Sequence, residues 1–286
     1  MTKQRLDTLL VELDLCSSRQ QAQRLIRAGE VMVKQQVIDK PGTEIDTTAE
    51  IKIKERSPYV SRGGEKLVKA LKLFEITVAG RICLDGGIST GGFTDCLLQA
   101  GAKLVYGVDV GYGQVAWSLR NDPRLILKER TNIRYLQPSD LYGNSPQFEE
   151  GDRGETIEAS GTSFYPDLGV VDVSFISLTK IIVPLWNLLQ APREILLLVK
   201  PQFEVGRERV GKKGVVRNSN DQADAIAQVL TAAQNQGWLY KGLTYSPITG
   251  PAGNIEYLLW MGMDSQTPTP DLGTIKQITQ SAVSNF

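Results

Sequence analysis

The residues whose types and spacing most suggest chemistry form a glycine-rich run after an apolar strand. The segment RICLD ends at Asp85, and GGISTGGF continues the chain to Phe93. Gly87, Gly91 and Gly92 stand where the backbone must turn and can approach a ligand closely. The G-x-G-x-x-G pattern of dinucleotide sites does not fit these glycines, and no phosphate-binding G-K-[ST] follows. The run indicates either another kind of ligand loop or a tight turn without a ligand.

The sequence contains no histidine, which limits the proton chemistry that is available. Histidine is the usual general base near neutral pH and the commonest metal ligand. Any proton transfer must therefore use Lys, Asp, Glu, Tyr or Cys. Cys16, Cys83 and Cys96 are far apart and lack the paired spacing of zinc or redox sites. We expect reduced cysteines, with Cys83 in the core, and no bound metal.

Alternating strands and helices are expected to position the glycine-rich run. From Gly80 onward, apolar segments are separated by helical ones: RICLD, KLVYGVDV, RLIL, LGVVDV and EILLLVK are strand-like. This pattern predicts an α/β fold, a doubly wound parallel sheet with helices on both faces. Ligands bind such sheets at the carboxyl ends of the strands. Helices are expected in QVAWSLRN and at about 177–189 and 221–236, with IEYLLWMGM as the last strand and TIKQITQSAV as a short final helix.

Residues 1 to about 56 are expected to form a separate small α+β unit. The leucines within 6–13 have helical spacing, and this pattern begins almost at the first residue. A second helix, capped by Ser17 or Ser18, ends at Gly29. GEVMVKQQVI and EIKIKE read as strands on either side of a Pro-Gly turn.

The segment SRQQAQRLIRAGEVMVKQQVIDKPGTEI resembles the S4-type RNA-binding module. The shared features are S-R at the helix start, L-I-x-x-G-x-V at its end and a later proline. The resemblance implies that Arg5, Arg19, Arg24 and Arg27 contact RNA. Without it, these arginines would be read as a solvated helix face.

The glycine-rich run itself resembles D-x-G-x-[SG]-x-G-G, the first motif of S-adenosylmethionine-dependent methyltransferases. A second carboxylate at the end of the next strand suits the two hydroxyls of an adenosine ribose. Gly86 and Ile88 depart from the usual pattern, so we expect a looser loop that is crowded near Ile88. The cofactor residues that the resemblance implies are Asp85, Gly87, Ser89, Thr90, Gly91, Gly92, Phe93, Asp109 and Val110.

Most of the chain resembles the TlyA family in successive blocks. These blocks are VSRGGEKLVKAL, STGGFTDCLL, DVGYGQVAWSLRNDPR, ERTNIR, DVSFISL, LVKPQFEVG, GVV and GPAGNIEYLLW. Members join an S4-type module to an FtsJ-like domain with a Rossmann-like methyltransferase fold, and are often labelled haemolysins. The resemblance implies 2′-O-methylation of cytidine ribose in 16S or 23S ribosomal RNA, with S-adenosylmethionine as methyl donor and ribosomal RNA or subunits as partner.

FtsJ-like enzymes use a Lys-Asp-Lys-Glu tetrad, which matches Lys66, Asp172, Lys200 and Glu256 here. Taken singly, each residue would be read as an ordinary surface or strand-end charge. A ribose hydroxyl must be oriented and must lose its proton as the methyl bond forms. We expect Lys200 to accept that proton, while Asp172 and Glu256 hold the lysines and the hydroxyl in register.

Four further residues near these motifs are candidates for contacts with RNA or adenine. Tyr112, Trp117 and Phe175 could stack on adenine or on a flipped cytosine, although aromatic residues in such places are more often core. Arg62, in the expected linker, could grip an RNA phosphate.

Composition and charge bound the alternatives. With 286 residues, 41% hydrophobic and 22% charged, the chain fits a two-domain globular protein. The net charge is zero, although the 193–217 segment is weakly basic and 143–165 resembles an acidic insertion. We expect domains at 1–56 and 65–265, a linker at 57–64 and a tail at 266–286. The chain has no apolar signal segment or membrane span, so we expect a cytoplasmic protein without membrane contact.

Other function classes fit the sequence less well. An RNA-binding or ribosome-assembly protein with a silent methyltransferase domain is the main alternative, and it would have no physical need for the tetrad. A pore-forming haemolysin is disfavoured, because we find no signal peptide, membrane span or strongly amphipathic basic helix in the sequence. A nicotinamide dehydrogenase is disfavoured by the glycine spacing. The oligomeric state is not visible in the sequence.

Overall fold

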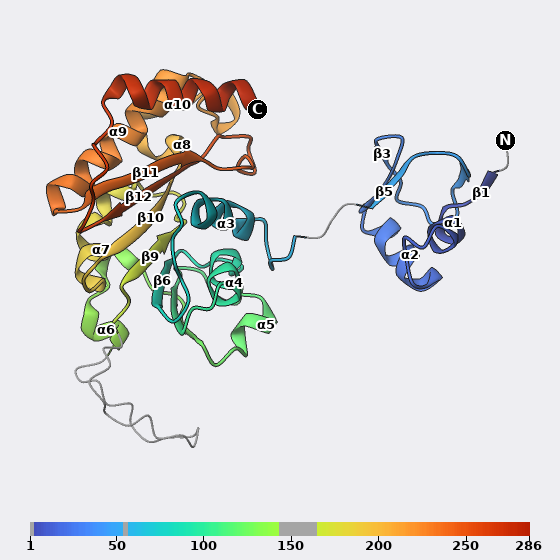
Figure 1. The fold of residues 1–286 in the computed structure, drawn as a ribbon, viewed down its shortest axis with the longest axis horizontal. Helices are drawn as coiled ribbons and strands as arrows, with labels where there is room; N and C mark the ends of the chain where they lie inside the picture. Colours follow the sequence, from blue (N-terminus) through green and yellow to red (C-terminus); the bar gives the residue numbers. More distant parts are fainter. Residues whose placement is uncertain (1–2, 54–56, 143–164) are drawn as a thin grey trace, which may run out of the picture. The chain divides into compact units, whose positions relative to one another are not determined.

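The computed structural model describes residues 3–53, 57–142 and 165–286 (Figure 1). It contains two compact units, residues 1–57 and 58–286, each described by itself below. The expected acidic insertion lies outside the described residues except for Tyr165. Within the described ranges, no helix is long and apolar enough to cross a membrane.

The first unit packs two helices against short strands. Leu6, Leu10 and Ile26 are fully buried at its centre. The Ser18 side chain accepts a hydrogen bond from the Gln21 amide and caps the second helix, as predicted. Its elements are β1 (Lys3–Arg5), α1 (Leu6–Glu12), α2 (Arg19–Arg27), β2 (Val31–Val33), β3 (Gln36–Val37), β4 (Glu44–Asp46) and β5 (Ile51–Ile53).

One prediction for this unit was wrong, because the chain does not enter a helix almost at its first residue. Residues 3–5 form β1, which pairs antiparallel with β4. A three-residue strand is too short to show a period of two, and its partner lies about 40 residues away in the sequence. The local pattern therefore could not reveal it.

The second unit is built on a seven-stranded sheet with the order β11-β12-β10-β9-β6-β7-β8. The five strands from β10 to β8 are parallel, which confirms the predicted α/β fold. The sheet is nevertheless mixed, because β12 runs antiparallel to both β10 and β11. The strands are β6 (Ile82–Gly86), β7 (Leu104–Val108), β8 (Leu125–Lys128), β9 (Leu168–Val171), β10 (Glu194–Val199), β11 (Leu239–Tyr245) and β12 (Tyr257–Gly262).

Strand β11 was not predicted, since its sequence LYKGLTY is an alternating edge pattern rather than an apolar run. Only alternate residues of β11 are buried, whereas β9 is buried throughout. Edge strands with one wet face are less apolar than central parallel strands. We looked for apolar segments in the sequence and therefore did not identify β11 as a strand.

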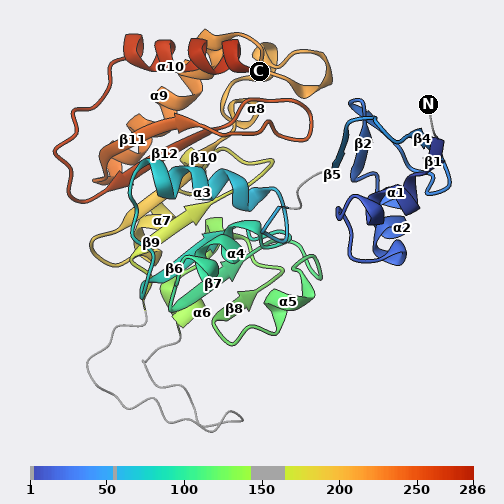
Figure 2. The same cartoon turned by 45° about the vertical axis from the view of Figure 1, so that its right-hand side comes forward.

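Helices cover both faces of this sheet (Figures 1 and 2). Neighbouring strand residues Cys83 and Leu84 belong to opposite cores, as the alternation of side chains along a strand requires. The core around Cys83 includes α3 and α4, and the core around Leu84 includes α7, α9 and α10. The longer helices are α3 (Gly63–Leu73), α4 (Gly92–Gln99), α7 (Ile182–Leu188), α9 (Ser219–Gln236) and α10 (Leu272–Asn285).

Short helical turns occupy the loops between these elements. The helix predicted at 177–189 is broken at Ile181, because Pro184 has no amide hydrogen and its ring excludes a continuous preceding turn. QVAWSLRN forms only one turn of helix. The short elements are α5 (Trp117–Arg120), η1 (Ile133–Tyr135), α6 (Pro138–Tyr142), η2 (Leu178–Lys180), α8 (Pro201–Glu204), η3 (Arg207–Arg209) and η4 (Lys212–Gly214).

Candidate active site

The sheet topology brings the residues of the proposed tetrad to one edge. Asp172 follows β9 and Lys200 follows the adjacent parallel β10, so both lie at carboxyl ends of strands. Glu256 precedes β12, which is antiparallel to β10 and therefore begins at the same edge. Lys66 reaches the edge from the first turns of α3. Residues 190 positions apart thus become neighbours.

The first pair of this cluster is a buried salt bridge between Lys66 and Glu256. Lys66 Nζ lies 2.6 Å from Glu256 Oε2 and donates a hydrogen bond to it. The two residues are only 8% and 1% exposed. Gly250 packs against the carboxylate so closely that a Cβ there would lie 2.7 Å from Glu256 Oε1. The geometry holds the Lys66 ammonium in one place.

The second pair joins Lys200 to Asp172. Lys200 Nζ lies 2.6 Å from Asp172 Oδ1 and donates a hydrogen bond of 2.8 Å to Ser174 Oγ. The Lys200 ammonium and Asp172 Oδ1 are close enough for an ion pair, but their angle is not that of a hydrogen bond. The buried Oδ1 atom therefore has no hydrogen-bond partner among the described residues. A third polar group could therefore be accepted at this carboxylate.

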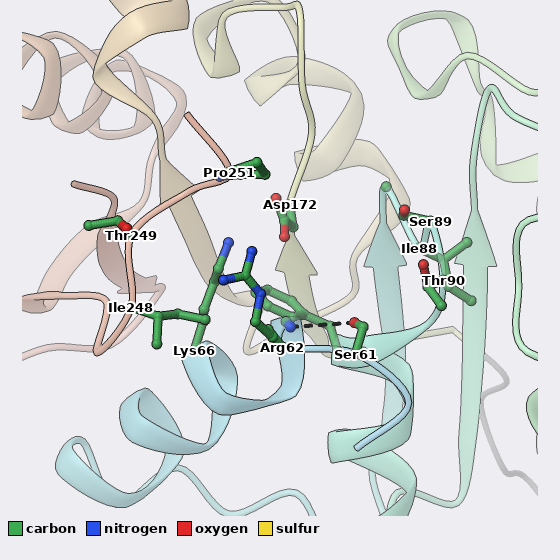
Figure 3. A pocket seen from close by; sticks show the side chains of 14 residues that line it. Ser61, Arg62, Lys66, Ile88, Ser89, Thr90, Asp172, Ile248, Thr249 and Pro251 are labelled. Carbon is green, nitrogen blue, oxygen red and sulfur yellow. Dashed lines mark hydrogen bonds between the residues drawn. The ribbon is translucent and has the colours of Figure 1, made fainter. Parts of the chain in front are cut away.

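A cavity of about 320 Å³ opens beside these pairs. Lys66 and Asp172 line it, while Glu256 and Lys200 contact them from behind. In Figure 3 the side chains of Lys66, on α3, and of Arg62, just before α3, point toward Asp172. The remaining lining residues are Ser61, Gly63, Gly87, Ile88, Ser89, Thr90, Gly92, Phe93, Ile248, Thr249 and Pro251.

The glycine-rich loop forms another wall of this cavity, and its glycines are required by close backbone contacts. Gly87 has φ +92°, and a Cβ at this position would lie 2.5 Å from the Asp172 carbonyl oxygen. Ser89 has φ +50° and donates its amide to Asp109 Oδ2 at 2.7 Å. The Gly111 amide donates to Asp109 Oδ1 at the same distance. Asp109 thus holds the glycine-rich loop against the loop that follows β7.

Asp85 lies at the base of the loop and is completely buried. Thr94 Oγ1 donates a hydrogen bond of 2.6 Å to Asp85 Oδ2, while Oδ1 is buried without a partner in the described part of the chain. Burial raises the pKa of Asp85 to about 7, although the Thr94 hydrogen bond opposes the shift. An unpaired buried carboxylate oxygen favours a cation or a donor in the adjacent space.

The expectation of a loose loop at Gly86 and a crowded one at Ile88 was wrong. A Cβ on Gly86 would lie 2.9 Å from Ile133 Cδ1, so the Ile133 side chain fills the space. A Cβ on Gly107 would lie 2.6 Å from Ile88 Cδ1. Ile88 is 3% exposed and fits over Gly107. Each departure from the motif is matched by a partner of complementary size.

Comparisons with known proteins identify the family. A model of the FtsJ-like methyltransferase family matches residues 59–263, which include the whole cluster described above. The chain belongs to the FtsJ-like methyltransferase family. A model of the S4 domain matches residues 4–51. The resemblance to these two families is therefore confirmed.

Similar proteins align over nearly the whole chain. The 16S/23S rRNA (cytidine-2′-O)-methyltransferase TlyA of Mycobacterium tuberculosis is 45% identical over 260 residues, 90% of this chain and 89% of its own length. A candidate rRNA methyltransferase of Bacillus subtilis, YqxC, is 47% identical over 264 residues, 91% of this chain and 87% of its own. A solved structure of a candidate hemolysin from Streptococcus thermophilus is 42% identical, with a TM-score of 0.70, and the match covers 99% of this chain and 97% of that one.

Within the FtsJ-like domain, the predicted cofactor residues divide into two groups. Those that line the cavity are Gly87, Ser89, Thr90, Gly92 and Phe93. Those that do not line it are Asp85, Gly91, Asp109 and Val110; Val110 is 68% exposed.

Several residues near the cavity were missed by sequence reasoning. Ser61, Ile248, Thr249 and Pro251 line it, but no role was assigned to them. Their closeness in sequence to candidate site residues could have identified them. Ser61 precedes Arg62, and the other three lie within nine residues of Glu256. Glu204, buried on α8, also escaped notice.

The three candidate aromatic residues are exposed, contrary to the reading that they belong to the core. Phe175 is 92% exposed and has φ +64°, an unusual backbone conformation for a bulky residue. Trp117 is 78% exposed and Tyr112 is 65% exposed. The Arg130 guanidinium lies 4.2 Å from the centre of the Tyr112 ring. Large exposed aromatic surfaces near a cavity suit contacts with flat ligands.

The four candidate arginines of the S4 domain differ in their surroundings. Arg5 and Arg19 donate hydrogen bonds of 2.9 to 3.0 Å to the fully buried Asp7. The hydrogen bond from Arg5 holds the pKa of Asp7 well below its usual range. Arg24 and Arg27 are exposed and form no ion pair within the described residues. Arg24 and Arg27 are therefore more available than Arg5 and Arg19 to a negatively charged partner.

Proposed function

We propose that the chain transfers the methyl group of S-adenosylmethionine to the ribose 2′-hydroxyl of a cytidine in 16S or 23S ribosomal RNA. The observation that carries the proposal is the pair of buried lysine–carboxylate contacts beside one cavity, at 2.6 Å each, next to the glycine-rich loop. Membership of the FtsJ-like family and the activity named for the Mycobacterium relative support it. We place this activity in the cytoplasm, where ribosomes assemble.

The residues of the loop fit S-adenosylmethionine. Gly87 and Gly92 let the loop pack tightly and line the cavity, since a Cβ would lie 2.5 Å from the Asp172 carbonyl oxygen or 2.2 Å from Ser61 Oγ. Asp85 Oδ1, at the base of the loop and not on the cavity wall, has no hydrogen-bond partner among the described residues, so a cation or donor that enters beside it would favour the ionised carboxylate. Asp109, at the end of β7, suits the ribose hydroxyls of the cofactor. When bound, the cofactor supplies a methyl group on a positively charged sulfonium.

The two salt bridges suit activation of a hydroxyl without a metal. A ribose hydroxyl is a weak nucleophile and must lose its proton as the new bond forms. We assign proton acceptance to Lys200 Nζ in its neutral amine form, which takes the hydroxyl proton and becomes the ammonium that Asp172 and Ser174 hold in position. Lys66, which lines the cavity and is held by its hydrogen bond to Glu256, is proposed to orient the target oxygen.

RNA contacts are proposed on both units. In the S4 domain, Arg24 and Arg27 bind RNA phosphates. Arg5 and Arg19, which are hydrogen-bonded to Asp7, bind RNA through their other N–H groups. Arg62 grips a phosphate at the mouth of the cavity. Phe175, Tyr112 and Trp117 offer stacking surfaces for bases.

The division of labour follows from this assignment. We propose that residues 1–56 bind RNA, that 57–64 connect the units and that 65–265 carry catalysis. The tail at 266–286 packs through α10 against α9 in the larger unit, where Ile275 and Ala282 are buried.

Tritiated methyl transfer from S-adenosylmethionine to ribosomal RNA and to ribosomal subunits tests the proposal. We expect label with the wild-type protein and loss of about 100-fold or more with Lys200→Ala, because general-base catalysis contributes at least that much. The affinity for S-adenosylmethionine, measured by calorimetry, should stay close to wild type. Cofactor binding without transfer to any RNA or particle would favour an RNA-binding protein with a silent methyltransferase domain.

A further inference from the structure

A buried carboxylate that the proposed chemistry does not use stands one helical turn beyond Lys200. Glu204, the last residue of α8, is 8% exposed and forms no ion pair in the described part of the chain. Burial raises its pKa, and only neutral donors oppose the shift. Burial of a carboxylate without a paired cation costs free energy, so we looked for the interactions that Glu204 makes in return.

The two carboxylate oxygens of Glu204 accept hydrogen bonds from residues 177 and 178, at the end of the loop that begins at Asp172 (the 172–178 loop). Ser177 Oγ donates to Oε2 at 2.5 Å, and the Leu178 amide donates to Oε1 at 2.9 Å. Ser177 in turn accepts the Thr179 amide at 3.2 Å and begins η2. Glu204 therefore holds Ser177 and Leu178 in place, where the loop ends and η2 begins.

The same short helix contacts this loop at two further points. Lys200, which precedes α8, donates to Ser174 Oγ at 2.8 Å. Phe203 packs against Phe175, with ring centres 5.3 Å apart. The α8 turn therefore contacts the 172–178 loop at three successive points, and Glu204 makes the last of them.

The loop needs such an anchor. Phe175 has φ +64°, which costs free energy in a residue with a side chain. Its ring is 92% exposed, so burial of Phe175 supplies little compensation. Contacts on either side of Phe175, at Ser174 and Ser177, must hold the strained residue in place.

We infer that Glu204 is a positioning residue that clamps the 172–178 loop and so keeps Ser174 against Lys200 for methyl transfer. The inference deepens the function proposed above and rests on it. Release of the clamp lets the strained loop relax and moves Ser174 away from Lys200 Nζ. Glutamine at position 204 keeps the shape and both contacts, because its oxygen can accept the Leu178 amide while Ser177 Oγ can accept from its amide group.

Steady-state kinetics of Glu204→Ala, Glu204→Gln and the matched control Gln202→Ala tests the assignment. Gln202 lies on the same helix, and its Oε1 has no hydrogen-bond partner among the described residues. Glu204→Ala should lower kcat about 10- to 100-fold, as small misplacements of reacting groups do. Its dissociation constant for S-adenosylmethionine should stay within about twofold, and Glu204→Gln should recover kcat to within about threefold.

Hydrogen–deuterium exchange of peptides that span 174–180 gives a readout independent of methyl transfer. The Leu178 amide should exchange faster in Glu204→Ala and in Ser177→Ala than in wild type or Gln202→Ala. Ser177→Ala removes only one of the two contacts, so it serves if Glu204→Ala fails to fold. Unchanged exchange and kcat would overturn the inference, and so would equal loss of cofactor binding and kcat that glutamine does not restore. Because exchange needs no RNA, it separates failure of the clamp from failure of the proposed function.

Discussion

Three carboxylates around the cavity are buried, and each is stabilised differently. Glu256 has a lysine at 2.6 Å, and Glu204 has two neutral donors. Asp85 has one hydroxyl donor and one bare oxygen. A buried charge is tolerated in proportion to its partners. Asp85 is therefore the carboxylate most ready to change its protonation when a ligand arrives.

Asp85 predicts a pH dependence of the ligand-free protein. Its folded-state pKa of about 7 exceeds the ordinary value of about 3.9, so the stability it contributes is complete below the ordinary value. This stability is lost as the pH rises through about 7. We expect Tm from scanning calorimetry to fall between pH 5 and pH 8, with a smaller fall in Asp85→Asn. Identical pH profiles for the two proteins would contradict the assignment.

The Lys66–Glu256 pair predicts a recoverable loss of stability. Lys66→Met leaves the Glu256 charge buried without its partner and should lower the free energy of unfolding by about 3–5 kcal/mol. Lys66→Met combined with Glu256→Gln should regain most of that loss in urea titrations yet transfer no methyl group. Additive losses in the double variant would show that the two side chains do not stabilise one another.

At the scale of elements, the site depends on contact between two loops that follow neighbouring strands. The glycine-rich loop after β6 lies against the backbone that follows β9, because Gly87 has no side chain. The loop after β10 reaches the side chains of Asp172 and Ser174 through Lys200. Asp172 therefore lies between the proposed cofactor loop and the proposed proton acceptor.

This contact predicts different outcomes for two glycine substitutions. Gly87 and Gly80 both have positive φ, but a Cβ on Gly80 meets nothing within 4 Å. Gly80→Ala should therefore cost only the left-handed penalty of about 1–2 kcal/mol in the free energy of unfolding and should leave cofactor binding unchanged. Gly87→Ala should cost more and weaken S-adenosylmethionine binding in calorimetry. Equal behaviour of the two variants would disprove the tight contact.

Much of this arrangement was predictable from sequence, because motif residues stand at the ends of apolar strands. The family resemblance implied a shared site for Asp172 and Lys200, and both follow parallel strands, whose carboxyl ends meet at one edge of the sheet. Glu204 was not predictable, since its partners Ser177 and Leu178 are set by tertiary packing. The use of Arg5 and Arg19 to neutralise Asp7 was likewise hidden, because burial of Asp7 has no local signature. The roles of the site residues stay predictions.

At the scale of the whole molecule, RNA binding and chemistry are proposed on separate units. Arg24 and Arg27 are exposed on α2, and the residues proposed for methyl transfer all belong to residues 58–286. Changes to these arginines should therefore alter encounter with RNA and leave the chemical step intact.

The double variant Arg24→Gln/Arg27→Gln should raise KM for RNA while kcat stays near wild type. The slope of log KM against log salt should fall by about one for each arginine. Lys52→Gln is the matched control, since Lys52 is an exposed cation of the same unit already paired with Glu50 at 2.8 Å. A fall in kcat at saturating RNA would argue against this separation.

The chemical identity of the methylated nucleoside tests the central claim most directly. Ribosomal RNA labelled by the wild-type protein would be digested to nucleosides and separated by chromatography with mass detection. We expect the label in 2′-O-methylcytidine after reaction with the wild-type protein and no label after reaction with Lys200→Ala. Label in a base-methylated nucleoside would contradict the assignment of Lys66, Asp172, Lys200 and Glu256 to a ribose hydroxyl.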